Sequence, residues 1–112
     1  MKKLSLMVMA ALLAAPALAL GATYKNVAVV DVSCSKKVAA NPDTHTRDCA
    51  LQCAQSGFGI LTSDQKFLKF DAEGNKRILA ELKASNKTDH LRVNVTGKVE
   101  GDTIKVSSVT LL

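Results

Sequence analysis

Three cysteines and one histidine are the residues of this chain that could do chemistry as a group. His45 precedes Cys49 and Cys53 in one short segment, and Cys34 lies upstream of them. Thiolate and imidazole ligands suit zinc and copper(I). One hypothesis is therefore a zinc or copper site made by Cys34, Cys49 and Cys53, with His45 as an optional fourth ligand.

The same cysteines could form a disulfide instead. A bridge from Cys34 to Cys49 or to Cys53 would close a loop of roughly 15 to 20 residues and stabilise the fold by about 3 kcal/mol. A Cys49–Cys53 bridge is also possible, because the two residues are one helical turn apart, but it would stabilise little. Because the cysteine count is odd, one thiol would stay free. A sulfur in a disulfide cannot also hold a metal, so the two hypotheses exclude each other, and the sequence leaves both open.

Helix geometry limits the metal hypothesis. On an unbroken helix His45 and Cys53 would be about 12 Å apart along the axis. One ion bound about 2 Å from each ligand cannot easily reach both. A four-ligand site therefore requires the helix to begin after His45, for example with Thr46 as its cap, whereas a site made by the cysteines alone does not.

The sequence favours a protein that is not an enzyme, and it predicts no catalytic residue. Dithiol redox motifs have two residues between their cysteines, but three separate Cys49 from Cys53. A free thiol near His45 could be a nucleophile, yet no third orienting group can be named. Asp31 is expected to be a bulge or rim residue of its strand, without an obvious partner.

The segment that carries the motif is predicted to be one short helix over residues 43–56. Asn41 or Asp43 could cap its start, and Gly57 is a plausible residue after its end. On a helical projection the two cysteines share one face with two alanines (Cys49, Ala50, Cys53, Ala54). This face of small side chains predicts close packing against the end of the first strand, where Cys34 lies.

Five strands are expected around this segment. Residues 24–33 are rich in β-branched side chains and predict a first strand that is buried on both faces at its centre. Residues 58–62 and 66–70 predict a second and third strand. Alternation from residue 91 to 111 predicts two more, joined by a tight Gly101-Asp102 turn. The phase of the alternation breaks at Ser107-Ser108, which predicts a bulge.

A second helix is predicted over residues 75–85, where apolar residues recur at helical spacing. The order predicts a mainly β fold with two short helices (α+β), built as a five-stranded OB-like barrel. One helix is inserted after strand 1, and the other lies between strands 3 and 4.

The first residues predict a signal peptide. Two lysines precede an apolar stretch, Ala17-Leu18-Ala19 matches the A-x-A type, and Leu20-Gly21-Ala22 is a second, weaker match. We expect a signal peptide over residues 1–22, with cleavage after Ala19 or Ala22, and a single domain over residues 23–112. The protein would then be periplasmic or secreted, with no transmembrane segment after processing.

The charge distribution does not favour a nucleic-acid partner. Loss of Lys2 and Lys3 with the signal peptide lowers the formal charge from +5 to +3, leaving 13 basic and 10 acidic residues. The basic residues are scattered and do not form a stripe. The few aromatic side chains are needed in the core, so stacking of bases is also disfavoured. The expected partner is an unidentified small ligand or protein.

The cysteine segment resembles a family of small exported bacterial proteins without an established function. In these proteins a pattern similar to His-x-x-Cys-Ala-x-x-Cys-x-x-x-Gly precedes an OB-like barrel. Here Cys49-Ala50, Cys53-Ala54 and Gly57 carry the resemblance, although three residues separate His45 from Cys49. The sequence therefore predicts a small exported binding or structural module stapled by a cysteine bridge, or else a metal-binding protein that uses the same residues.

Overall fold

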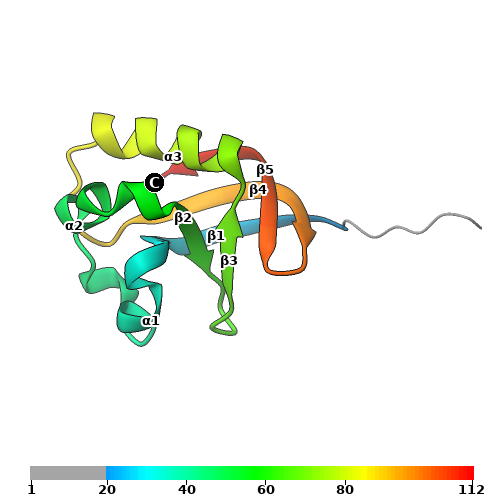
Figure 1. The fold of residues 1–112 in the computed structure, drawn as a ribbon, viewed down its shortest axis with the longest axis horizontal. Helices are drawn as coiled ribbons and strands as arrows, with labels where there is room; N and C mark the ends of the chain where they lie inside the picture. Colours follow the sequence, from blue (N-terminus) through cyan, green and yellow to red (C-terminus); the bar gives the residue numbers. More distant parts are fainter. Residues whose placement is uncertain (1–19) are drawn as a thin grey trace, which may run out of the picture.

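The computed structural model describes residues 20–112, and these form a closed barrel of five strands with short helices around it (Figure 1). The strand order is β1-β2-β3-β5-β4, and neighbours pair antiparallel except β3 and β5, which run parallel. The prediction of a mainly β fold on a five-stranded barrel is confirmed. The predicted signal peptide lies outside the described residues up to position 19.

The strands are β1 (Leu20–Asp31), β2 (Phe58–Leu61), β3 (Phe67–Phe70), β4 (Arg92–Glu100) and β5 (Thr103–Leu111). The α-helices are α1 (Ser35–Val38), α2 (Arg47–Gln52) and α3 (Ala72–Ala84). Three 3-10 turns, named η2 (Val32–Cys34), η3 (Pro42–Thr44) and η4 (Ala54–Ser56), flank α1 and α2. The described part of the chain thus has more than the two helices that the sequence predicts.

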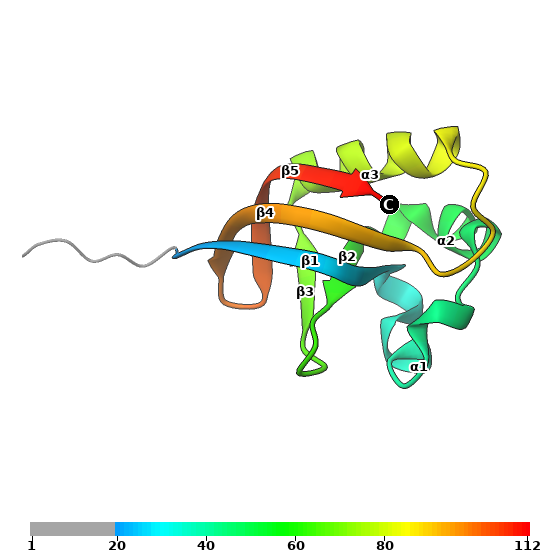
Figure 2. The same cartoon turned by 180° about the vertical axis from the view of Figure 1, so that it is seen from behind.

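Strand β1 is the element on which the barrel closes. Its first part pairs with β4 and its last part pairs with β2, and Ala28 has a partner in both strands. Seen from behind, β1, β4 and β5 run side by side along the barrel (Figure 2). All residues from Val27 to Asp31 are buried, as the run of β-branched residues predicts. The end of β1 therefore lies deep in the fold.

The β4–β5 hairpin follows the predicted pattern closely. Glu100 pairs with Thr103 across the Gly101-Asp102 turn, and Gly101 adopts a φ of +64°. Thr96 pairs with Ser108 while the next residue pairs with Val106, so Ser107 is the extra residue of a bulge. The bulge predicted at the serines is confirmed.

Helix α3 covers one end of the barrel and supplies core side chains. Asp71 caps its first turn by accepting from Gly74 N at 3.0 Å and also accepts from Val106 N at 3.1 Å. Ile78 and Leu82 are fully buried in the core. The helix therefore begins three residues before the predicted start at residue 75, because Asp71 offers a cap that the apolar spacing does not reveal.

The prediction of one continuous helix over residues 43–56 is wrong. The chain makes the 3-10 turn η3, extends at His45 (φ −72°, ψ 127°), and then starts α2. Thr46 causes the restart, because its side chain accepts from Cys49 N at 3.1 Å and caps a new helix. The helix thus begins after His45, which is the condition that a metal site including His45 would require.

An ion pair fastens η3 to the barrel. Both Nε and Nη2 of Arg92 lie 3.0 Å from the carboxylate of Asp43. This pairing with the guanidinium holds the pKa of Asp43 below its ordinary value of 3.8. A carboxyl group with a lowered pKa in the folded state stabilises the fold above its unfolded pKa, and the stabilisation is lost as the pH falls through the folded value.

Replacing Arg92 by Gln should therefore lower the free energy of unfolding by about 1 kcal/mol at neutral pH, the upper range for a partly exposed pair. Below the lowered pKa that Asp43 has in the folded protein, where its carboxyl group is protonated in both proteins, the pair contributes nothing. Urea unfolding at the two pH values measures both differences. An equal loss at both would show that Arg92 acts through packing and not through Asp43.

Candidate functional site

Asp31 ends β1 and organises the turn that follows. Its carboxylate is fully buried, with no exposed surface. Oδ2 accepts from Cys34 N at 3.1 Å and from Ser33 Oγ at 2.8 Å, so Asp31 caps η2. The same interactions fix the position of Cys34 relative to the carboxylate. Contrary to the expectation from sequence, Asp31 is not a rim residue.

His45 is the hydrogen-bond partner that allows Asp31 to be buried. Its Nε2 lies 2.6 Å from Oδ1 of Asp31, and its side chain is only 5% exposed. A carboxylate oxygen accepts, so Nε2 is the donor of this hydrogen bond in the tautomer that carries its hydrogen there. The extended backbone at His45, between η3 and α2, turns the ring toward the end of β1. His45 therefore holds the carboxylate of Asp31 in place in the described structure.

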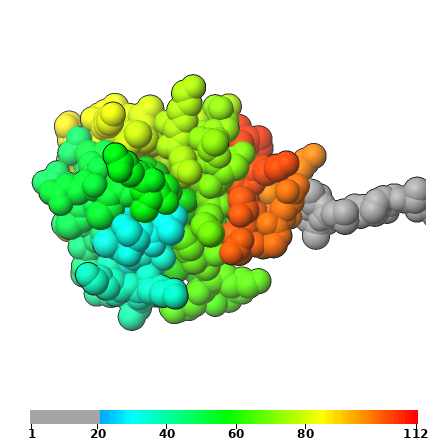
Figure 3. Space-filling view, in the orientation of Figure 1, coloured from blue at the N-terminus to red at the C-terminus, as the bar shows by residue number. Residues whose placement is uncertain are grey.

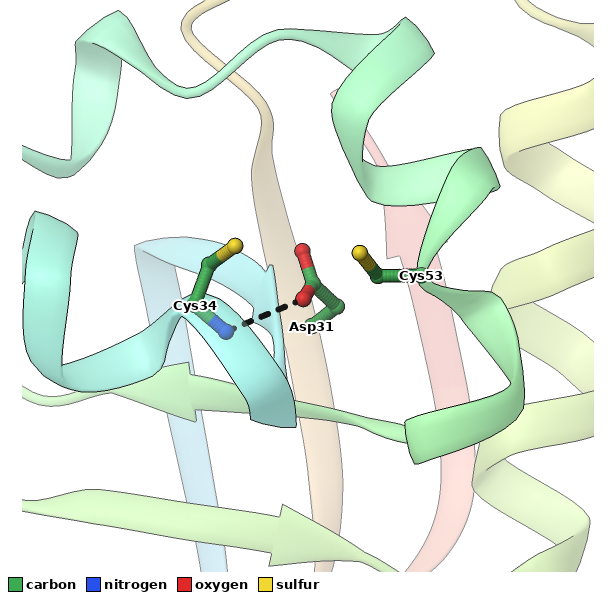
Figure 4. Close-up of side chains that lie close together, drawn as sticks. All are labelled: Asp31, Cys34 and Cys53. Carbon is green, nitrogen blue, oxygen red and sulfur yellow. Dashed lines mark hydrogen bonds between the residues drawn. The ribbon is translucent and has the colours of Figure 1, made fainter.

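Cys53 approaches the same carboxylate from the other side. It is the C-cap residue directly after α2, where its N–H donates to the carbonyl of Cys49. One carboxylate oxygen of Asp31 and the two sulfurs of Cys34 and Cys53 all lie within 4.8 Å of one another. In Figure 4 the two sulfurs point toward each other, with the carboxylate between them.

The site lies near the surface. Both Cys34 and Cys53 are partly exposed, whereas Asp31 is buried beneath them. In the space-filling view the segment after β1, in cyan, and the segment around α2, in green, lie next to each other on one face (Figure 3). The sulfurs are thus within reach of solvent and of a dissolved ion.

Two of the three predicted cysteine ligands come together, and the third does not. Cys49 is exposed and lies outside the group, although the helical projection places it on the buried face. The reason is that α2 packs on the core through Ala50 and Leu51, and that the helix ends before Cys53. Cys34 and Cys53 lie close together, as predicted. All three cysteines are free thiols in this structure.

Asp31 is the site residue that reasoning from sequence missed. The available signal was a carboxylate at the end of an apolar run that predicts burial on both faces, since a buried charge requires a partner. What the sequence could not supply was the partner. His45 is 14 residues further along the chain and reaches Asp31 only through the fold.

The arrangement does not resemble a Cys–His nucleophile. Partial burial raises the pKa of the Cys34 thiol above its ordinary value of 9.0, and the negative charge of Asp31 raises it further. The thiol is therefore protonated at neutral pH. The Nε2 of His45 is bonded to Asp31 and does not activate a sulfur.

The donors do fit a thiophilic metal ion. A tetrahedral zinc ion with Zn–S bonds of about 2.3 Å keeps its sulfur ligands about 3.8 Å apart. The ligand atoms here are at most 4.8 Å apart, so an adjustment of about 1 Å or less brings them into range. Asp31 raises the pKa of the Cys34 thiol, whereas a bound cation would lower it. A thiol that coordinates a metal ion is deprotonated.

No protein family, no curated protein and no solved structure matches this chain. The resemblance to small exported bacterial proteins therefore stays a prediction. In the part of the chain that the structure describes, no helix has the length and apolar character needed to cross a membrane.

Proposed function

We propose that the protein is a small exported module that binds a thiophilic metal ion, zinc or copper(I), through Cys34, Cys53 and Asp31. The observation that carries the proposal is the convergence of two thiols and a buried carboxylate within 4.8 Å. A carboxylate oxygen is also a ligand for zinc, so the position of Asp31 beside the two sulfurs supports a cation site in addition to the contact that Asp31 makes with His45. The role of the module would be to bind or hand over the metal.

An OB-like classification of the barrel is part of this proposal. The strand order, the parallel pairing of β3 with β5 and the position of α3 between β3 and β4 support it. In this classification the segment from η2 to η4 is an insertion between the first two strands. The metal site lies where the insertion meets the end of β1, so the barrel serves as a rigid support.

Export is proposed from the N-terminal sequence pattern. Residues 20–22 pair with β4 opposite Val99, Lys98 and Gly97. Cleavage after Ala19 would keep all of these pairs, and cleavage after Ala22 would remove them. Export matters for the site because thiols oxidise to disulfides more readily outside the cytosol.

A second candidate function is a structural or binding module stapled by a Cys34–Cys53 disulfide, with an unidentified small ligand or protein as its partner. The closeness of the two sulfurs favours it, although they would have to approach to about 2.05 Å. Such a bridge closes a loop of about 20 residues and would stabilise the fold by about 3 kcal/mol. Cys49, which is exposed, would be the remaining free thiol.

Thiol counting and elemental analysis on the purified protein distinguish these functions. The metal proposal expects three thiols in the denatured, unreduced protein and one equivalent of zinc or copper. The bridge expects one thiol without reductant, three with reductant and no metal. Three thiols without any metal, also after incubation with zinc and removal of excess ion, would contradict the metal proposal.

A further inference from the structure

The hydrogen bonds of Asp31 limit how it can bind a metal. A carboxylate offers about four lone-pair sites, two on each oxygen. Oδ2 accepts from Cys34 N and Ser33 Oγ, which uses both of its sites. Among the described residues, Oδ1 accepts from His45 Nε2 alone. One lone pair therefore remains, on Oδ1, and Asp31 can be a ligand through that oxygen alone.

The described residues offer no fourth histidine, cysteine or carboxylate ligand at this place. The group of donors close enough to hold one ion consists of Asp31, Cys34 and Cys53. Cys49 is exposed and outside the group, and His45 is bonded through Nε2 to the carboxylate. A site completed from this part of the chain would have two sulfur ligands and one oxygen ligand.

We infer that the metal site has an open fourth position, and that this position takes a single thiolate from outside the chain. The inference rests on the proposed metal-binding function. Zinc sites whose role is structural are closed by four protein ligands, whereas sites with three protein ligands keep a position for water or another ligand. Cys34 and Cys53 are partly exposed residues, which puts this position near the surface.

A thiolate is the favoured class of ligand for two reasons. Soft sulfur donors suit both zinc and copper(I). Lys36 and Lys37 are exposed on α1, which follows Cys34 directly, so they supply positive charge beside the site for an anionic ligand. A thiolate from another protein or from a small molecule would therefore complete the coordination and offer a route for transferring the ion.

Cobalt(II) substitution tests the open position. The protein would carry Cys49→Ser, so that Cys49 of a second molecule cannot supply the thiolate, and a phosphine would keep the other cysteines reduced. Sulfur-to-cobalt charge transfer shows that Cys34 and Cys53 bind the ion, and the d–d bands report the fourth ligand. Adding mercaptoacetate should shift the d–d bands saturably and raise the charge-transfer intensity by about half, from two thiolates to three.

Cobalt content after gel filtration should stay at one equivalent per chain, which shows that mercaptoacetate joins the site and does not remove the ion. Charge transfer without any response to mercaptoacetate would overturn the open position while leaving the metal site standing. A response to imidazole but not to mercaptoacetate would overturn the thiolate. Absence of charge transfer before any ligand is added would overturn the metal-binding function itself.

Discussion

Replacing either Cys34 or Cys53 by Ser should lower the affinity for zinc by more than about 100-fold, because in the proposed site each thiolate would be one of only three protein ligands. A serine hydroxyl keeps the size of the side chain but is a poor ligand for a thiophilic ion. The affinity is measured by competition with a chromophoric chelator under a phosphine reductant. The two variants should behave alike, because both sulfurs lie in the same group.

Cys49→Ser is the matched control. It is the same substitution four residues before Cys53, but at an exposed position outside the group, so the zinc affinity should stay unchanged. Far-UV circular dichroism of all three variants establishes that the fold is retained. If Cys49→Ser lost as much affinity as the other two, the ligand set described here would be wrong.

Replacing His45 by Leu should lower the free energy of unfolding by about 1–3 kcal/mol, the range found when a buried polar group is left without its hydrogen-bond partner. The carboxylate of Asp31 has no exposed surface and would lose its partner at 2.6 Å. Urea unfolding of the metal-free protein, with a chelator present, measures this loss without any contribution from bound ions.

Two further variants make the His45 result specific. His90→Asn removes an exposed histidine whose φ of 51° suits asparagine, and the free energy of unfolding should change by less than about 0.5 kcal/mol. In the double variant His45→Leu with Asp31→Asn no buried carboxylate is left without its partner, so it should be more stable than His45→Leu alone. A double variant less stable than His45→Leu would show that His45 does not act through Asp31.

The barrel could be predicted because its signals are local. The β-branched run of β1 and the alternation of β4 and β5 each depend on neighbouring residues, and so do the Gly101-Asp102 turn and the bulge at Ser107. The prediction of one helix over residues 43–56 is wrong because two possible caps compete there. Asn41 or Asp43 could start the helix early, but the hydroxyl of Thr46 caps a new helix that begins after His45.

The site could be predicted only in part. The closeness of Cys34 to Cys53 follows from the small side chains around α2 and from the position of Cys34 just after β1. The Asp31–His45 contact does not follow, because it depends on the angle at which η3 and α2 return to the barrel. The exposed position of Cys49 likewise depends on where α2 ends, which the cysteine spacing does not reveal.

X-ray absorption at the zinc edge of the zinc-loaded Cys49→Ser protein tests the central claim most directly, because it counts the ligands of the ion. The account predicts two sulfur ligands at about 2.3 Å, and one carboxylate oxygen together with a fourth light ligand at about 2.0–2.2 Å. The sulfur count should fall to one in a protein that also carries Cys53→Ser. A shell of nitrogen and oxygen alone, in protein whose thiols are all reduced, would contradict a metal site at Asp31, Cys34 and Cys53.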